Sequence, residues 1–394
     1  MDKETKPQLS AGLMFAVTSF FWCAQYSYSN FVNPELERMG MSAAYMGLVS
    51  GAYGLTQTLL RIPLGMAADR IGRQKPFVVI GSLLAAVSSA IFLIFYQPAG
   101  FLFARALTGI ASASWVSFTV LYSAYFPLSE GPRRISQLNL ANMGGRLAGY
   151  LLIIFIVPVF GVKSSFTFSL AAGSLAFLAS LGLKEAPGVR QGLSIRELLN
   201  VSKDKYLRIC SSIGILTQVI AFSTYYGFTV NVAKSIGADS AALTWLNIAL
   251  VVPTLLINFL ITSRLLRRFG PRALVTWGFV LGALYSLLVP LAENMWQLYL
   301  LQILAGSHSS MSFAVLLGQS VRDIPQNRRG VAMGFYQAVY GIGMTLGPVM
   351  MGLMIDWSDL RSAFFIVAAF SVLSAVLAWR LMKMPAGIEK KGAV

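Results

Sequence analysis

Four ionisable side chains fall inside long apolar stretches of the sequence: Arg61, Arg105, Arg146 and His308. No aspartate or glutamate lies in the middle of any of these stretches. A charge in the hydrocarbon of a membrane is costly, so such side chains must face protein or water. A guanidinium is suited to binding a carboxylate or phosphate through two hydrogen bonds. A solute that carries such an anion is therefore one candidate partner for the arginines.

Two of the arginines lie on polar stripes with helical spacing. Asn142 and Arg146 are four residues apart, and so are Gln57 and Arg61, and residues at this spacing share one face of a helix. The functional hypothesis places both stripes against a substrate. In the structural alternative, Arg61 extends toward the cytoplasmic surface and Arg146 binds the C-terminal carbonyls of a neighbouring helix. The sequence leaves both interpretations open.

His308 is the only histidine of the chain and lies near the middle of its apolar stretch. An imidazole in this position could bind substrate or carry a proton, because its charge changes near neutral pH. The alternative is a buried histidine whose hydrogen bonds are satisfied within the protein.

The composition is that of a membrane protein. Hydrophobic residues make up 56% of the 394 residues, charged residues only 12%, and the mean hydropathy is +0.67. These values exclude an ordinary soluble protein. Apolar runs of about twenty residues, the length that spans hydrocarbon, recur along the chain. They predict an all-α integral membrane protein with twelve transmembrane helices, near residues 12–33, 44–67, 77–96, 100–126, 137–160, 164–184, 208–232, 241–266, 273–292, 295–321, 330–355 and 361–382.

Metal, cofactor and catalytic chemistry are not expected. The two cysteines, Cys23 and Cys210, lie in or beside apolar runs, and they form no cluster with histidine or carboxylates. No glycine-rich nucleotide-binding loop follows a strand, so the chain itself has no ATPase. An intramembrane enzyme would need a nucleophile with a base, paired carboxylates or metal ligands within the spans, and none is visible. We predict no cofactor, no metal and no enzymatic activity.

The net charge of +16 is explained by membrane topology. With both termini in the cytoplasm, cytoplasmic segments and helix ends hold 24 of the 31 lysines and arginines, and the opposite side holds Arg38, Lys163, Lys234 and Arg361. Such an excess marks the cytoplasmic side. We predict a multi-pass protein of the cytoplasmic (inner) cell membrane, with no nucleic acid as partner. The first apolar run is longer than a signal-peptide core and is predicted to be a retained helix.

The sequence repeats itself at an offset of 198 residues. Six helices followed by six related helices are typical of two parallel repeats. The predicted domains are an N-terminal six-helix bundle (1–184), a cytoplasmic linker (185–207) and a C-terminal six-helix bundle (208–394). The residues that return are Tyr28, Val32, Asn33, Gly72, Gly145 and Gly149, which reappear as Tyr226, Val230, Asn231, Gly270, Gly343 and Gly347.

A charged turn rich in glycine separates the second and third predicted helices. Its sequence is Gly65-Met66-Ala67-Ala68-Asp69-Arg70-Ile71-Gly72-Arg73-Gln74-Lys75. Such a turn cannot continue either helix and must form a hairpin at a membrane surface. The spacing Gly-x-x-Ala-Asp-Arg-x-Gly-Arg resembles the signature loop of the major facilitator superfamily. It departs from that pattern at Ala67, where leucine is common, and at Gln74, where a basic residue is common.

The resemblance implies two pseudo-symmetric bundles that expose a central site to one side of the membrane at a time. In the family, the equivalent of Asp69 caps the start of helix 11 when the cytoplasmic side is closed, and Pro325–Gly330 also matches that helix start. A carboxylate near a helix N-terminus is stabilising. The second copy of the loop, Arg267–Arg272, has lost the aspartate, so this role falls to one half only.

Several charged residues are therefore assigned to a gate. Glu130 and Asp323 are the expected partners of Arg73 and of Arg268 or Arg272. The alternative is that these are solvated loop charges that only set topology. The predicted gating residues are Gly65, Asp69, Arg70, Gly72, Arg73, Glu130, Asp323 and Arg268.

The family fold also places helices 1, 4, 7 and 10 around the cavity. Aromatic side chains with polar tips suit a partly apolar organic solute that a few hydrogen bonds orient, although a simple packing stripe is the competing interpretation. The candidates from these helices are Trp22, Gln25, Tyr26, Trp115, Tyr122, Gln218, Tyr225 and His308. Arg105 resembles the arginine of a second family motif, which is tied to proton transfer or helix packing. Arg105 and His308 are the proton-coupling candidates.

The leading hypothesis is a secondary transporter of a small, partly apolar organic solute, with an organic anion as the candidate class. The alternative is proton-coupled efflux of drug-like or lipid-like compounds, which usually draws on a carboxylate in the cavity, and here the nearest are Glu35 and Glu37 at the outer rim. A sensor of the same fold that does not transport is also open. The expected partners are a small-molecule substrate, the lipid bilayer and a co- or counter-transported ion, and the protein is expected to be a monomer.

Overall fold

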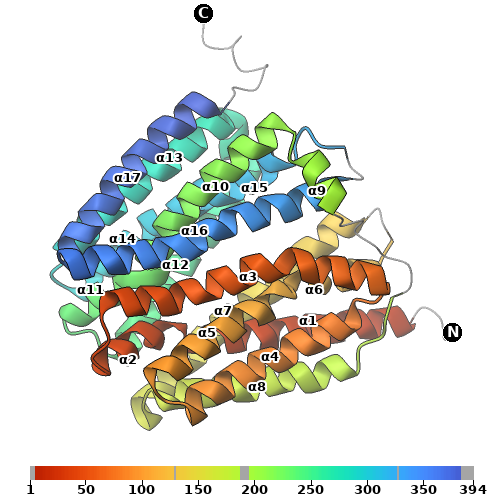
Figure 1. Ribbon diagram of the computed structural model, residues 1–394, viewed down its shortest axis with the longest axis horizontal. Coiled ribbons are helices and arrows are strands. Elements are labelled where there is room, and N and C mark those ends of the chain that lie inside the picture. Colours follow the sequence, from red (N-terminus) through yellow and green to blue (C-terminus); the bar gives the residue numbers. More distant parts are fainter. Residues whose placement is uncertain (1–4, 128–129, 187–194, 326–327, 383–394) are drawn as a thin grey trace, which may run out of the picture. The chain divides into compact units, whose positions relative to one another are not determined.

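The computed structural model describes residues 5–127, 130–186, 195–325 and 328–382. In these ranges all regular secondary structure is helical, and a long helical stretch is found at each of the twelve predicted places (Figure 1). The all-α prediction is therefore confirmed. The short helix α9 (Ile195–Val201), within the predicted linker, was not predicted.

Eleven of the described helical stretches are long and apolar enough to cross a membrane. The long helix that does not meet this measure is α3 (Ala43–Ile71), which has 29 residues. Its sequence includes Gln57, Arg61 and Asp69, and all three side chains are buried. The polar face of α3 lowers its hydropathy, but this face is covered by protein.

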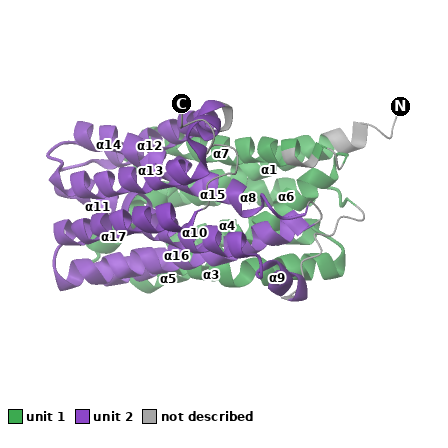
Figure 2. Ribbon diagram, turned by 90° about the horizontal axis from the view of Figure 1, so that it is seen from above, with its two compact units in different colours: residues 1–41, 52–195 green, residues 42–51, 196–394 purple. Residues whose placement is uncertain are grey.

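The chain forms two compact units (Figure 2). Unit 1 comprises residues 1–41 and 52–195, and unit 2 comprises residues 42–51 and 196–394. The helices of unit 1 are α1 (Thr5–Ser27), α2 (Val32–Arg38), most of α3, α4 (Lys75–Ile94), α5 (Pro98–Ala113), α6 (Trp115–Ala124), α7 (Gly131–Phe160) and α8 (Lys163–Leu181). Within this unit α1 packs on α7 and α8, and α4 packs on α5 and α8.

Unit 2 contains helices that are interrupted by wider, π-helical turns. Its elements are α9, α10 (Lys205–Ser223), a π-helical turn (Thr224–Phe228), α11 (Thr229–Ser235), α12 (Ser240–Leu260), a second π-helical turn (Ile261–Leu265), α13 (Leu266–Leu288), α14 (Met295–His308), a third π-helical turn (Ser309–Ala314), α15 (Val315–Ser320), α16 (Arg329–Trp357) and α17 (Leu360–Leu381). Here α10 packs on α16, α12 on α14, and α13 on α17 (Figure 1).

Side-chain caps explain where several helices of unit 2 begin. Asp204, Asp239, Asn294 and Asp359 each accept a hydrogen bond from the backbone N–H three residues later. These bonds satisfy N–H groups that have no partner inside the helix. The hydrogen bonds from Ser362 also hold the pKa of Asp359 below its usual value.

The first residues of α3 pack within unit 2. The carboxylate of Asp356, in the last turn of α16, accepts hydrogen bonds from the backbone N–H groups of Ala43 (2.9 Å) and Ala44 (3.0 Å). A side chain on Gly47 would overlap the backbone of Pro348 in α16. A cap and a close helix contact therefore fix this helix start.

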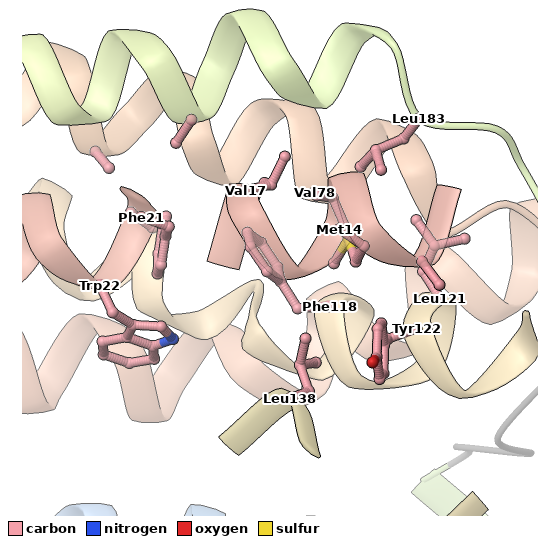
Figure 3. Close-up of a cluster of buried hydrophobic side chains, with 14 residues drawn as sticks. Met14, Val17, Phe21, Trp22, Val78, Phe118, Leu121, Tyr122, Leu138 and Leu183 are labelled. Atoms are coloured by element: carbon pink, nitrogen blue, oxygen red, sulfur yellow. The ribbon is translucent and has the colours of Figure 1, made fainter. Parts of the chain in front are cut away.

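The hydrophobic core of unit 1 is formed by residues of α1 and of α4 to α8 (Figure 3). The ring centres of Phe21 in α1 and Phe118 in α6 are 4.9 Å apart. Leu183, just after α8, is only 2% exposed and belongs to the same cluster. The other buried members include Met14, Val17, Trp22, Val78, Leu121, Tyr122 and Leu138.

The internal repeat is visible in the helix contacts. Gly145 and Gly149 of α7 lie against the backbone of α1, whereas their repeat partners Gly343 and Gly347 of α16 lie against the backbone of α10. Small residues let helices approach closely. The turn glycines agree as well, since Gly72 has φ +71° and Gly270 has φ +75°, a conformation that favours glycine. The two halves thus share the geometry that glycine permits.

We expect Gly145→Ala and Gly343→Ala each to destabilise the protein by about 1–3 kcal/mol, because a Cβ would overlap the carbonyl oxygen of Ser19 or of Ile215. The melting temperature of the purified protein in detergent measures the effect. Gly144→Ala is the matched control, because nothing lies within 4 Å of a Cβ at that neighbouring position. Equal melting temperatures for all three variants would contradict the close approach.

Candidate functional site

Unit 1 contains a cluster of aromatic rings around one arginine. Trp22 and Tyr26 are one turn apart on α1, with ring centres separated by 5.8 Å, and Trp115 of α6 meets Trp22 edge-on at 5.4 Å. The guanidinium carbon of Arg146 on α7 lies 3.9 Å from the centre of the Tyr26 ring. Tyr150, one turn further along α7, meets Tyr26 at 6.1 Å. We call these five residues the aromatic–arginine cluster.

The stacking of Arg146 on Tyr26 has a physical consequence. A guanidinium over an aromatic face is stabilised by about 0.5–2 kcal/mol, depending on how far it is desolvated. Stacking uses the flat face of the cation, whereas its N–H groups point outward in the plane and can bind a planar anion. The ring of Tyr26 therefore orients the guanidinium of Arg146.

A second polar group in the cluster is the indole of Trp22. This side chain is 6% exposed, and its Nε1 is buried without a hydrogen-bond partner in the described part of the chain. A buried indole N–H normally finds an acceptor. The indole N–H is thus an available donor beside the arginine.

Other predicted candidates of unit 1 contribute to packing. Gln25 donates a hydrogen bond to the Ser112 hydroxyl (3.2 Å) and a longer one to the carbonyl of Thr108 (3.5 Å), which tie α1 to α5. Tyr122 is 5% exposed and belongs to the hydrophobic core (Figure 3). Asn142, by contrast, is half-buried one turn before Arg146. The contacts of Gln25 and Tyr122 favour the packing interpretation, whereas Asn142 remains a neighbour of the cluster.

The side chains of the polar stripe on α3 are buried. Tyr53, Gln57 and Arg61 are 8%, 6% and 6% exposed. The guanidinium carbon of Arg105 lies 4.9 Å from the centre of the Tyr53 ring, and Gly109 allows α5 to approach α3 closely. Arg105 therefore lies at a contact between α5 and α3, which favours its structural role.

His308, the last residue of α14, is fully buried in unit 2. Its Nδ1 lies 2.9 Å from the carbonyl oxygen of Gly278 in α13. A carbonyl only accepts, so Nδ1 carries the proton and Nε2 of the neutral ring keeps its lone pair. This Nε2 is buried without a hydrogen-bond partner among the described residues. The bond to Gly278 thus orients the imidazole. The three predicted roles of His308, in substrate binding, in proton transfer or as a satisfied buried residue, stay predictions.

Aromatic and polar side chains surround this imidazole. The rings of Phe279 and Tyr225 lie 5.7 Å and 6.1 Å from it. Beyond Tyr225, the hydroxyl of Tyr285 lies 2.8 Å from the Thr229 hydroxyl and accepts a hydrogen bond from the Gln302 amide. Gln218, two turns before Tyr225, is 7% exposed. We call the His308, Tyr225 and Tyr285 group the imidazole cluster.

Two π-helical turns adjoin the imidazole cluster, and sequence reasoning missed both. One turn, Thr224–Phe228, contains Tyr225, and the other, Ser309–Ala314, follows His308 directly. Such turns occur often at functional sites because they shift side chains out of the helical register. The residue types in these two turns do not distinguish them from an ordinary α-helix in the sequence, since each turn depends on packing within the folded unit.

The signature loop is the predicted hairpin. Gly72 ends α3 with positive φ, and the N–H groups of Gly72 and Arg73 donate to the carbonyl of Ala68. Asp69 is 8% exposed, and its carboxylate accepts a long hydrogen bond (3.4 Å) from the amide of Gln74. Of the other predicted gating residues on this hairpin, Gly65 is buried and Arg70 is exposed.

The predicted partners of the loop charges need one correction. Glu130 binds Arg134, one turn along α7, at 2.7 Å, and in the described part of the chain it does not pair with Arg73. A neighbour on the same helix is reached without ordering a second segment. Asp323 binds Arg322 at 2.9 Å, and this hydrogen bond raises the pKa of Arg322.

Arg268, the remaining gating candidate, lies in the second copy of the loop. Its guanidinium carbon is 5.2 Å from the centre of the Phe269 ring. The guanidinium carbon of Arg272, four residues further, lies 3.9 Å from the centre of the Trp379 ring of α17. Both cations thus stack on aromatic rings of unit 2, and their pairing with Asp323 stays a prediction.

We expect Gly282→Ala to destabilise the protein by about 1–3 kcal/mol, because a Cβ would come within 2.8 Å of Nδ1 of His308. In a His308→Ala background, Gly282→Ala should lower the free energy of unfolding by at least about 0.5 kcal/mol less than in the wild type. The reason is that the imidazole, with which the new Cβ clashes, is then absent. Thermal unfolding of the four proteins of this double-mutant cycle measures the coupling. Strict additivity would show that Gly282 does not hold the imidazole.

Comparisons with known proteins agree with this architecture. The sequence profile of the Major Facilitator Superfamily matches residues 14–232 and 211–393. The chain is 24% identical over 357 residues to an uncharacterized MFS-type transporter of Methanocaldococcus jannaschii, covering 87% of this chain and 90% of that protein. It is 22% identical over 343 residues to the quinolone resistance protein NorA of Staphylococcus aureus, covering 82% and 83%.

A solved structure supports the same fold. The crystal structure of a mutant of the nucleoside transporter NupG superposes with a TM-score of 0.79 at 16% identity, covering 95% of this chain and all of that one. The predicted fold, with two pseudo-symmetric helical bundles, is thereby confirmed. The chain belongs to the major facilitator superfamily of multi-pass membrane transporters for small molecules, and it is not an enzyme.

Proposed function

We propose that the protein is a secondary transporter of a small, partly apolar organic anion. The observation that carries the proposal is the stacking of Arg146 on Tyr26, 3.9 Å away, beside Trp22 and Trp115. Flat aromatic surfaces suit the apolar body of such a solute, and the guanidinium suits its carboxylate or phosphate. The unpartnered N–H of Trp22 adds a donor for the same anion or for a second acceptor.

The distribution of carboxylates supports an anion more than a cation. Within the described helices, acidic side chains lie near helix ends. Glu35, the buried carboxylate nearest to α1, already accepts hydrogen bonds from Arg38 (2.8 Å) and Tyr96 (2.5 Å). The carboxylate of Glu35 is therefore already bound by two donors that lie outside the aromatic–arginine cluster.

The second candidate is proton-coupled efflux of drug-like or lipid-like compounds. The name of the relative NorA, a quinolone resistance protein, favours this function. The aromatic–arginine cluster could also bind an apolar drug, with His308 as the proton carrier, because Nε2 of His308 has no hydrogen-bond partner in the described chain. The two candidates differ in the role of Arg146, which is essential only for an anion.

The transport cycle follows from the family architecture. We propose alternating access between two related bundles, with the aromatic–arginine cluster as the substrate-binding part of unit 1. In unit 2, Gln218, Tyr225 and His308 are the proposed polar contributors. Arg61 and Gln57, on the buried stripe of α3, are proposed as a further cation and amide for the solute.

We expect Arg146→Gln to weaken binding of an aromatic carboxylate probe, such as 1-naphthoate, by at least about tenfold, since hydrogen bonds to a charged partner contribute about 1.5–3 kcal/mol. Binding is measured by thermal shift of the purified protein, and flux is measured in proteoliposomes with an ethidium cation as the second probe. Loss of naphthoate binding with ethidium flux unchanged supports an anion site.

The matched control is Arg361→Gln, because Arg361 also lies over an aromatic ring, Phe365, but outside the cluster. Ethidium flux that survives in Arg146→Gln, together with no naphthoate binding in the wild type, would establish efflux of cationic drugs instead. Equal naphthoate affinity in the wild type and Arg146→Gln would remove the anion hypothesis.

We also propose that both termini and the signature loop face the cytoplasm, because of the predicted charge distribution. In intact cells, an impermeant maleimide should label Lys163→Cys and spare Ile71→Cys, since Ile71 lies within the loop and its native side chain is 60% exposed. The native thiols Cys23 and Cys210 are buried and give little background. The reverse labelling pattern would invert the topology.

A further inference from the structure

The helix after the signature loop lacks a cap from its own sequence. The N-cap residue of α4, Gln74, makes no side-chain capping bond. The carboxylate of Glu185 supplies the cap from a distant segment: its two oxygens accept hydrogen bonds from the backbone N–H groups of Gln74 (2.9 Å) and Lys75 (3.0 Å). An anion at a helix N-terminus also interacts favourably with the helix dipole.

The segment that carries Glu185 is itself anchored. Leu183 is inserted into the hydrophobic core of unit 1, to which Val78 of α4 also belongs (Figure 3). The Tyr125 hydroxyl donates to the carbonyl of Lys184 (2.6 Å), and the Lys75 ammonium donates to the carbonyl of Leu181 (2.9 Å). Burial and the negative charge of Glu185 raise the pKa of Tyr125, so its hydroxyl remains a donor. The end of α8 is thus a fixed support for the carboxylate.

The capped turn leads directly to the signature aspartate. Gln74, whose backbone N–H is bound by Glu185, is 4% exposed, and its side-chain amide donates to Asp69. Asp69 is 8% exposed. A buried amide keeps its position only if its backbone is fixed, because the hydrogen bond to Asp69 is already long at 3.4 Å.

From these contacts we infer that Glu185 is a positioning residue for the signature loop: by holding the backbone at Gln74 and Lys75, it sets the place of the Gln74 amide and hence of Asp69. The inference rests on the proposed transport cycle only in assigning gating to this loop. The inference also gives a structural role to Glu185, the first residue of the predicted linker 185–207. This linker was expected only to connect the two bundles.

Residue-resolved hydrogen exchange of the full chain in lipid nanodiscs tests the inference without any substrate. The informative amides are those of Gly72 and Arg73, which bond to Ala68 and do not touch Glu185. If Glu185 positions the loop, Glu185→Gln should speed exchange at these two amides by at least about tenfold, as well as at Gln74 and Lys75. In Glu185→Asp, which keeps the carboxylate, the exchange rates of these amides should lie between those of the wild type and those of Glu185→Gln.

Asp239→Asn is the matched control, because it weakens a carboxylate cap of α12 in unit 2 and should leave the loop amides unchanged. Faster exchange confined to Gln74 and Lys75 would overturn the inference, since Glu185 would then only cap α4. Equal acceleration in Asp239→Asn would overturn it as well, by showing general loosening. Absence of naphthoate flux in the wild type would count against the proposed substrate class and would leave this test intact.

Discussion

The constraint that governs this protein is that a charge inside a membrane must be matched by protein, water or cargo. The described helices contain the cations Arg61, Arg105 and Arg146 within their spans, whereas their acidic side chains lie near helix ends. Two of the arginines lie over aromatic rings, Arg105 over Tyr53 and Arg146 over Tyr26. A ring orients a guanidinium but leaves its charge in place. A guanidinium held over a ring can also bind a carboxylate or phosphate, and this is the physical basis of the proposed substrate class.

The same constraint explains which parts of the fold could be predicted from the sequence. Span lengths are fixed by the thickness of the hydrocarbon, so twelve helices could be located from apolar runs alone. The repeated glycines predicted close helix contacts, and Gly145 and Gly343 indeed lie against the backbones of α1 and α10. In each case a local residue property determines the geometry. The polar stripe on α3 could be predicted for the same reason, since a helix fixes which residues share a face.

Contacts between distant segments could not be predicted in this way. The cap of α4 comes from Glu185, 110 residues further along the chain, and Glu130 was expected to pair with Arg73 but binds Arg134. The spacing of residues along the sequence does not show which of several charged side chains lies close to a given partner in the folded protein. The π-helical turn that contains Tyr225 escaped prediction for a related reason, because an extra residue in a helix turn is stabilised by packing and not by residue type. Gln25, expected at the site, instead bonds to Ser112.

The two copies of the loop have the same glycine turn but differ in their charged residues. Gly72 and Gly270 keep the same positive φ, so the turn itself has been retained in both copies. At the offset of the repeat, however, Arg267 occupies the position of Asp69, and Arg272 that of Gln74. In unit 1 the carboxylate and amide are buried and bonded to each other. In unit 2 Arg272 lies over Trp379. A backbone turn constrains only its glycine, whereas a buried carboxylate needs donors around it. In the first copy the amide of Gln74 is one such donor to Asp69, and in the second copy, where an arginine replaces the aspartate, an arginine also replaces this amide.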